Sequence, residues 1–470
     1  MSSISLRNEH VQWEKGQVTT WTPYHENGQV YQVVSEGYQN IQQLFRDSKR
    51  FKDRDFLIDE TGRRSTFSNT IETGETLSEA LRDQAFSGVS IGDRVGVCGK
   101  NSLEWIYSFL AISFSGLTVI PMNSWWTSRE LEYAIKHADL KIIFADGERI
   151  ERLMKISPEV LQGLKIISLD NNQESKHGVM KFSDWINHGK TVSGSSPLVV
   201  HPDSRAMIMY TSGTTNFPKG VVLTHRGICH AISVLPKSKK SSTDSTKACL
   251  LTVPLFHATG LYGIFFTSLL LGRKIVILKK WNPEKALELI EKEKVTHFTG
   301  VPTMILDMLS SPELKKRNIS SLKNVGSGGA PPPAGVAKSV KEKLKASPSQ
   351  GYGLTEVNAT ATTISAAEYE KRPTSCGKPI PGVEIQIWDE EKDVPIPVGQ
   401  VGRVLIRGPT VMLEYWKDYQ ATVNAITKDG WFKSGVRCYN AFILVTNFCR
   451  ITVLWIMMDF CIFLDDPRIY

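Results

Sequence analysis

A short polar segment near the middle of the chain carries residue types that bind phosphate. It reads Tyr-Thr-Ser-Gly-Thr-Thr-Asn-Phe-Pro-Lys-Gly and spans residues 210–220. Apolar residues on both sides predict a strand, a loop and a second strand. Glycines let the backbone approach a ligand closely, and backbone N–H groups, hydroxyls and a lysine can then surround phosphate oxygens. A polar hairpin turn is the alternative interpretation, although a turn alone does not require Lys219.

The spacing in this segment does not fit the commoner phosphate-binding loop. A P-loop needs G-x-x-x-x-G-K-[ST]. Five residues after Gly213 the chain has Pro218 instead of glycine, and Lys219 is followed by Gly220 instead of serine or threonine. The dinucleotide-binding fingerprint fits poorly as well.

A second segment, Gln350–Glu356, places an aromatic ring between two glycines and a carboxylate after them. A flat ring can lie against a planar base, and Glu356 is a hard oxygen ligand suited to Mg²⁺ beside a triphosphate. Alone, such a segment usually marks a turn. Residues 345–349 leave little room for a strand before it.

Two further segments are informative only together with the first two. Residues 326–331 read Gly-Ser-Gly-Gly-Ala-Pro, and residues 254–260 read Pro-Leu-Phe-His-Ala-Thr-Gly. A glycine-rich strand exit is otherwise an ordinary turn. A lone histidine such as His257 is more often structural than catalytic, but an imidazole can orient an anionic substrate.

Together, these four segments resemble the adenylate-forming superfamily of acyl-CoA synthetases, aryl-CoA ligases, luciferases and peptide-synthetase adenylation domains. The resemblance covers about residues 50–435. It implies that the loop closes over the β- and γ-phosphates of ATP, that Tyr352 stacks on adenine, and that Glu356 coordinates Mg²⁺. It also implies that Thr355 contacts the α-phosphate and that His257 lies beside the carboxylate being activated.

The residues implied to bind ATP are Thr211, Ser212, Gly213, Thr214, Thr215, Lys219, Gly329, Ala330, Pro331, Gly351, Tyr352, Gly353 and Thr355. Those implied in catalysis are Lys219, His257, Thr355 and Glu356, with Glu356 as the metal ligand.

The implied reaction has two steps and uses ATP, Mg²⁺ and CoA. A carboxylate attacks the α-phosphorus of ATP to give acyl-AMP and pyrophosphate, and the CoA thiol then displaces AMP. The partner is a small carboxylic acid, fatty or aryl, which the sequence does not identify. The segment around His257 and the absence of carrier-protein segments favour a CoA ligase over a peptide-synthetase module.

The elements around these segments alternate between strand and helix. Strands are expected at 94–98 and 117–121, and Thr127 with Glu130 forms a capping box that opens a helix. After the phosphate segment, Asn282 caps another helix with Pro283 at its first position. This alternation predicts an α/β fold with two doubly wound parallel-sheet subdomains. Alternating strands after Cys376 predict a small β-barrel-like subdomain.

The expected ranges are 1–200 for the first α/β subdomain, 201–375 for the second, 376–435 for the β-rich subdomain and 436–470 for an unrelated apolar tail. Residues 430–435 resemble the run-up to a Ser/Thr-Gly-Asp motif whose aspartate binds the ATP ribose, but the next residue is Val436. Because nothing beyond it matches, we expect the mobile C-terminal domain to be missing and turnover to be impaired. A non-catalytic nucleotide or acyl binder is the alternative.

The composition and the net charge of the chain are consistent with an enzyme that binds anionic substrates. The 470 residues carry a net charge of +8, with 22% charged and 41% hydrophobic residues. This mild excess suits ATP and CoA, and nucleic-acid binding is not inferred. Seven cysteines without C-x-x-C spacing argue against zinc and disulfide frameworks. No secretory leader is visible, so we expect a cytoplasmic protein, with a peroxisomal or mitochondrial location as the alternatives. Polar residues interrupt the apolar tail, so we do not expect it to contact a membrane.

Overall fold

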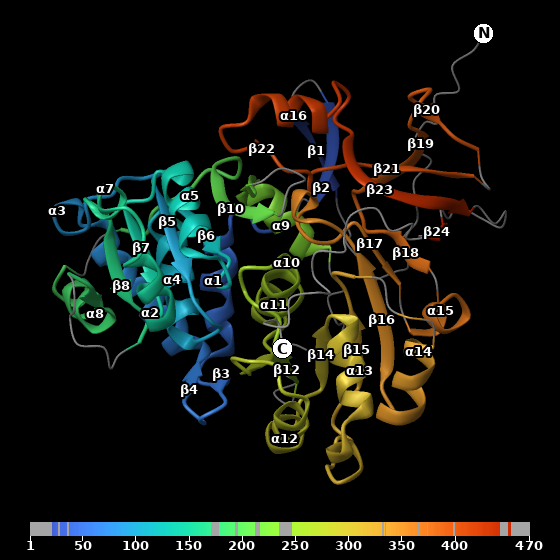
Figure 1. Cartoon of the computed structure of the whole chain (residues 1–470), viewed down its shortest axis with the longest axis horizontal. Helices are drawn as coiled ribbons and strands as arrows, with labels where there is room; N and C mark the ends of the chain where they lie inside the picture. The colour runs from blue at the N-terminus through green and yellow to red at the C-terminus, as the bar shows by residue number, and fades with distance from the viewer. Residues whose placement is uncertain are drawn as a thin grey trace.

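Two large β-sheets with helices packed around them make up the described part of the chain (Figure 1). The computed structural model describes residues 21–26, 29–34, 37–170, 178–192, 196–211, 217–234, 247–330, 333, 335–364, 366–373, 375–397, 400–441 and 450–452. A hairpin of β1 (Trp21–Glu26) and β2 (Gln29–Val34) forms a third, two-stranded sheet. Within these residues, no helix has the length and apolar content needed to cross a membrane.

The first sheet has eight strands and a mostly parallel core. In order across the sheet they are β22 (Glu414–Tyr415), β11 (Lys219–Thr224), β10 (Arg205–Thr211), β6 (Thr118–Met122), β5 (Arg94–Cys98), β7 (Ile142–Ala145), β8 (Lys165–Ser168) and β9 (Met180–Lys181). From β10 to β9 all neighbours are parallel, whereas β11 and β22 are antiparallel to their partners. The central strands are buried and apolar, as strands covered on both faces require.

The second sheet has fourteen strands, parallel in one part and antiparallel in the other. Its order is β20 (Val394–Pro395), β19 (Glu384–Asp389), β21 (Val401–Arg407), β23 (Phe432–Ala441), β24 (Arg450–Thr452), β18 (Ser375–Pro379), β17 (Thr362–Ile364), β16 (Ser347–Tyr352), β15 (Asn324–Ser327), β14 (His297–Gly300), β12 (Ala248–Leu251), β13 (Lys274–Ile277), β3 (Asp55–Asp59) and β4 (Arg64–Thr66). Strands β16 to β3 are parallel. The β-rich region is therefore an antiparallel continuation of this sheet.

The helices lie between and outside the sheets in Figure 1. They are α1 (Ile41–Ser48), α2 (Phe67–Arg82), α3 (Gln84–Ser87), α4 (Leu103–Phe114), α5 (Ser128–Ala138), α6 (Gly147–Leu153), α7 (Pro158–Leu161), α8 (Phe182–Thr191), α9 (His225–Ser233), α10 (Ala258–Gly260), α11 (Thr267–Leu271), α12 (Pro283–Glu293), α13 (Pro302–Ser310), α14 (Val336–Ser339), α15 (Ala366–Lys371) and α16 (Tyr419–Ala425). Short 3₁₀ turns are η1 (Lys49–Phe51), η3 (Pro312–Lys315) and η5 (Thr355–Val357); η2 (Leu261–Phe266) and η4 (Val340–Leu344) are π-helical.

The aromatic core joins helices that belong to different parts of the chain. Every residue of α4 is buried. The Phe45 ring of α1 lies 6.4 Å from that of Phe109 in α4 and 6.3 Å from that of Phe266 in η2. A Cβ on Gly74 of α2 would lie 2.7 Å from the Leu110 Cβ, so the α2–α4 contact requires glycine at that position. Burial of these rings contributes much of the packing energy.

The α/β fold with two parallel-sheet units is confirmed, and two local details differ from expectation. A strand, β16, does precede Tyr352, because η4 ends in a left-handed residue at Lys345 and the chain reverses at once to pair with β15. The sheets also do not divide at residue 200: β3 and β4 belong to the second sheet, while β10 and β11 belong to the first. Strand β23 continues past Gly435 to Ala441.

Candidate functional site

The predicted site segments follow the carboxyl ends of parallel strands. The phosphate loop follows β10, the His257 segment follows β12, the glycine-rich segment follows β15, and Gly353 follows β16. Loops at this edge of parallel sheets are where α/β proteins bind ligands. The topology of the second sheet therefore brings the His257, glycine-rich and Gly353 segments to one edge, whereas the phosphate loop belongs to the first sheet.

The phosphate loop is anchored at both ends. Thr211 closes β10, Lys219 opens β11, and the two are direct partners across the antiparallel pair. Phe217, just inside the loop, stacks on Tyr133 of α5 with ring centroids 4.4 Å apart. The predicted phosphate ligands Ser212, Gly213, Thr214 and Thr215 lie outside the described residues.

Lys219 and Glu356 meet at a residue that the sequence motifs do not include, Tyr415 of β22. The Lys219 Nζ lies 5.1 Å from the centroid of the Tyr415 ring, which is a cation–π distance. The Tyr415 hydroxyl donates to Oε1 of Glu356 at 3.0 Å. The Met412 amide also donates to the Glu356 carbonyl at 2.7 Å. Residues 412–415 therefore contact both the backbone and the side chain of the glutamate.

Glu356 is partly buried, and its carboxyl is the group predicted to bind the metal ion. Burial raises the pKa of this carboxyl, and the Tyr415 hydrogen bond and the Lys219 charge act in the opposite direction. Within the described chain, no group of three or more His, Cys, Asp or Glu side chains is arranged to hold a metal ion. A cation at Glu356 would therefore take its remaining ligands from phosphate and water, which is the usual way Mg²⁺ is bound.

The aromatic residue of the second motif closes β16 and is deeply buried. Tyr352 is 5% exposed. Burial raises its pKa, and the nearby hydroxyl of Ser434 in β23 acts against that shift. Gly351 pairs with Thr363 of β17, and a Cβ on Gly353 would lie 1.9 Å from the Ala359 carbonyl oxygen, so only glycine fits there. Thr355 then begins η5, which carries Glu356.

The glycine-rich segment faces the His257 segment. Gly329 has a left-handed φ of +80°, and a Cβ there would lie 3.8 Å from Oγ1 of Thr259. Ala330 follows it, while Pro331 lies outside the described residues. Ser327 and Gln350, partners across β15 and β16, each bury an oxygen without a hydrogen-bond partner in the described part of the chain. Buried polar atoms of this kind usually bind a water molecule or a ligand.

His257 stands at the start of α10 among aromatic rings. Its ring centroid lies 4.5 Å from that of Phe256 and 5.9 Å from that of Trp125. The His257 side chain is exposed to solvent at one side, and the protein atoms packed around the imidazole lower its pKa to about 4. The imidazole is therefore neutral near pH 7, and it can donate or accept a hydrogen bond but supplies no charge.

A buried asparagine fixes the segment that carries His257. The Asn101 side chain donates to the Val253 carbonyl at 3.1 Å and accepts from the Leu255 amide at 2.9 Å. Asn101 follows β5 of the first sheet, whereas residues 253–255 follow β12 of the second. It thus connects the carboxyl edges of the two sheets. No motif in the sequence marks it.

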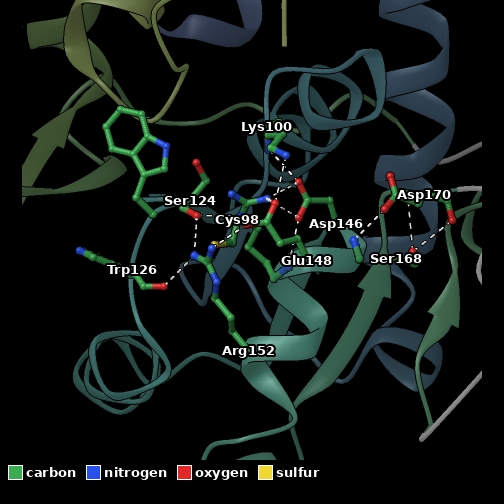
Figure 2. A network of polar contacts seen from close by, with 12 residues as sticks. Cys98, Lys100, Ser124, Trp126, Asp146, Glu148, Arg152, Ser168 and Asp170 are labelled. Atoms are coloured by element: carbon green, nitrogen blue, oxygen red, sulfur yellow. Dashed lines mark hydrogen bonds and ion pairs between the residues drawn. The ribbon is translucent and has the colours of Figure 1, made fainter. Parts of the chain in front are cut away.

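An arginine network holds the loop that carries Trp125 (Figure 2). Arg149 Nε donates to the Ser124 carbonyl at 2.7 Å, and Arg152 donates to the carbonyls of Ser124 and Trp126, both at 3.0 Å.

Both arginines pair with Glu148, which also pairs with Lys100 at 3.0 Å. With both neighbours fixed, Trp125 is presented toward Phe256 and His257 and remains 49% exposed.

A hollow of about 550 Å³ opens beside the phosphate loop. It is lined by Tyr133, Phe217, Lys219, Asp418, Gln420, Ala421 and Asn424. Lys219 is thus the residue shared between this hollow and the contact with Tyr415.

Comparison with known proteins identifies the family to which this sequence is similar. A model of the AMP-binding enzyme family matches residues 44–416. The chain is 31% identical to 4-coumarate–CoA ligase CCL1 from Humulus lupulus, over 83% of this chain and 71% of the relative. It is 28% identical to a long-chain-fatty-acid–CoA ligase from Bacillus subtilis, over 84% and 73% respectively.

Solved structures share the fold. An anthranilate–CoA ligase, AuaEII, solved with anthranoyl-AMP, superposes with a TM-score of 0.76 at 23% identity, covering 86% of this chain and 76% of that one. The N-terminal domain of FACL13 from Mycobacterium tuberculosis gives 0.74 at 22% identity, covering 88% and 99%.

Proposed function

Since the chain belongs to the AMP-binding enzyme family, we propose that it activates a carboxylic acid with ATP and transfers the acyl group to CoA. In the first step the carboxylate oxygen attacks the α-phosphorus and pyrophosphate leaves. In the second step the CoA thiol attacks the acyl carbon and AMP leaves. Fatty and aryl acids are the candidate substrates, in line with the names of the relatives.

The observation that carries this proposal is the meeting of Lys219 and Glu356 at Tyr415. A cation and a carboxylate that contact the same tyrosine suit a triphosphate with its counterion. Lys219 would hold the β- and γ-phosphates together with the loop 211–215, and Glu356 would hold Mg²⁺. The Mg²⁺ ion would neutralise charge on the phosphates. Catalysis of this kind is mostly positioning and electrostatic stabilisation.

The acid would bind between the glycine-rich segment and the aromatic group around His257. A neutral imidazole can donate one hydrogen bond to the carboxylate without forming an ion pair that would hold it back from attack. Trp125 and Phe256 offer a flat apolar surface to the rest of the acid. The unpaired oxygens of Ser327 and Gln350 are nearby donors and acceptors for the adenylate.

We also propose that turnover in this chain is weak. Val436 stands where the resemblance places an aspartate that binds the ribose hydroxyls, and a valine offers no acceptor. Its position in β23, two residues after Ser434, which lies close to Tyr352, supports this assignment. Loss of hydrogen bonds to a charged acceptor costs about 1.5–3 kcal/mol of binding.

Acid-dependent exchange of labelled pyrophosphate into ATP tests the proposal. The panel would include 4-coumarate, anthranilate and fatty acids of graded length, each with and without CoA. Exchange with at least one acid, and a thioester when CoA is added, would support the ligase. ATP binding without exchange would instead favour a non-catalytic nucleotide or acyl binder.

A further inference from the structure

Tyr415 contacts both charged residues at the phosphate end of the site. Its ring lies against the Lys219 ammonium group, and its hydroxyl donates to Oε1 of Glu356. One neutral side chain therefore contacts both a cation and a carboxylate. The tyrosine engages Oε1 only, so the carboxylate keeps acceptor positions for a hard cation.

The backbone of Tyr415 is fixed on both sides. Tyr415 is the cross-strand partner of Val221. The amides of Leu413 and Trp416 donate to the carbonyls of Val222 at 2.9 Å and Gly220 at 2.7 Å. The Tyr415 side chain is 8% exposed and close-packed. The ring is therefore held on the same strand pair that carries Lys219.

Lys219 and Glu356 form no ion pair with each other in the described part of the chain. Opposite charges in a partly buried site attract strongly, and direct contact would occupy both groups. A lysine paired with a carboxylate has less charge left for phosphate. A carboxylate paired with a lysine has fewer acceptor positions left for a metal ion.

We propose that Tyr415 is a positioning residue that separates and aims these two groups. Its ring keeps Lys219 directed toward the phosphates and away from Glu356, and its hydroxyl holds Glu356 for the divalent cation. The phenol gains and loses no proton in this role. The inference rests on the proposed function, because it takes ATP and a divalent cation as the ligands.

Two substitutions separate the ring from the hydroxyl. Tyr415→Phe keeps the ring and removes the hydrogen bond, so we expect weaker metal binding in the presence of ATP, by about 10-fold, as for other residues that orient a metal ligand. ATP binding without metal should stay unchanged. Tyr415→Leu also removes the aromatic face, so Lys219 is free to pair with Glu356 and metal-free ATP binding should fall as well. Tyr419→Phe is the matched control, because Tyr419 is 81% exposed on α16.

The test uses binding measurements that need no turnover. Electron paramagnetic resonance of free Mn²⁺ reports metal binding with ATP present, and calorimetry reports ATP binding without metal. Circular dichroism and thermal melting check folding, and Tyr415→Phe keeps the test valid if Tyr415→Leu does not fold. Weaker Mn²⁺ binding in Tyr415→Phe, with Mn²⁺ binding in Tyr419→Phe equal to wild type, supports the inference. Equal Mn²⁺ binding in wild type, Tyr415→Phe and Tyr419→Phe would overturn it while leaving the ligase proposal standing. A wild-type chain that binds no ATP would overturn the ligase proposal itself.

Discussion

Thr211 and Lys219 are direct cross-strand partners, so the phosphate loop leaves the first sheet and returns to it at one register position. The loop is therefore anchored by the hairpin that carries it, and Lys219 stands on a strand. Tyr210 adds to the anchor, because its hydroxyl lies 2.9 Å from Nδ1 of His137 in α5. A lysine on a fixed strand is pre-positioned for phosphate, which lowers the ordering cost of binding.

Removal of the Lys219 charge should impair the adenylation step. We expect Lys219→Ala to lower acid-dependent pyrophosphate exchange by about 10²–10³, as for other deleted groups that stabilise transition-state charge. Lys392→Ala is the control, because that side chain is 76% exposed and lies 3.8 Å from Asp389 in a surface pair. The control should stay near wild type. Equal exchange in both variants would remove Lys219 from the mechanism.

Asn101 should stabilise the contact between the two sheets. Asn101→Ala leaves the buried Leu255 amide and Val253 carbonyl without their partner, at a cost of about 1–3 kcal/mol for each group. The midpoint of urea unfolding measures this loss. Asn101→Asp keeps the acceptor for Leu255 but buries a carboxylate against the Val253 carbonyl, so it should be no more stable than the alanine variant at pH 7. An unchanged midpoint in Asn101→Ala would contradict the assigned role.

Acid should destabilise the fold through its buried histidines. Burial lowers the pKa of His225 from its usual 6.5 to about 4, and its Nδ1 accepts from the Ile41 amide at 3.4 Å. Between about pH 6.5 and 4 the unfolded chain binds a proton that the folded chain does not, so stability falls as pH falls through this window. One such histidine lowers the free energy of unfolding by about 1–2 kcal/mol at pH 5 relative to pH 7.

Urea unfolding at pH 7 and pH 5 measures this effect. His225→Gln should lose less stability than wild type between the two pH values. His201→Gln is the control, because that side chain is 72% exposed, and it should keep the wild-type difference. The same difference in all three proteins would show that His225 does not cause the acid sensitivity.

An aspartate at position 436 should strengthen ATP binding. Val436→Asp restores the acceptor that the family motif carries, and we expect ATP to bind about 10-fold more tightly. This factor corresponds to the lower end of the free energy that hydrogen bonds to a charged group contribute. Calorimetry with ATP and Mg²⁺ measures the change. Val436→Asn tests the charge, and should give a smaller gain. Weaker binding in both variants would show that this position does not face the ribose.

The sequence predicted helix starts correctly where the capping hydrogen bonds join residues close together in the chain. The capping box of Thr127 and Glu130 is present, and Asn282 caps α12 with Pro283 at its first position. The alternation of strands and helices predicted both parallel-sheet units. By contrast, the strand before Tyr352 was missed, because it forms through pairing with β15 and not from the residues of 345–349 alone.

The residues missed at the site act over long sequence separations. Tyr415 lies 59 residues from the Glu356 that it contacts, and Asn101 lies 154 residues from Leu255. Neither residue has a local pattern that indicates its partner. The two-residue strand β22 owes its existence to the exposed edge of β11. Motif reasoning therefore predicted the candidate ligand-binding segments, whereas the groups that position those segments could be identified only from the fold.

The proposed reaction cleaves ATP at the α-phosphorus. The most direct measurement is to incubate the protein with ATP, Mg²⁺ and each acid of the panel without CoA, and to quantify all phosphate products by mass spectrometry. We predict acyl-adenylate and pyrophosphate in equal amounts with the preferred acid. Formation of ADP and inorganic phosphate, with no adenylate for any acid, would contradict the account.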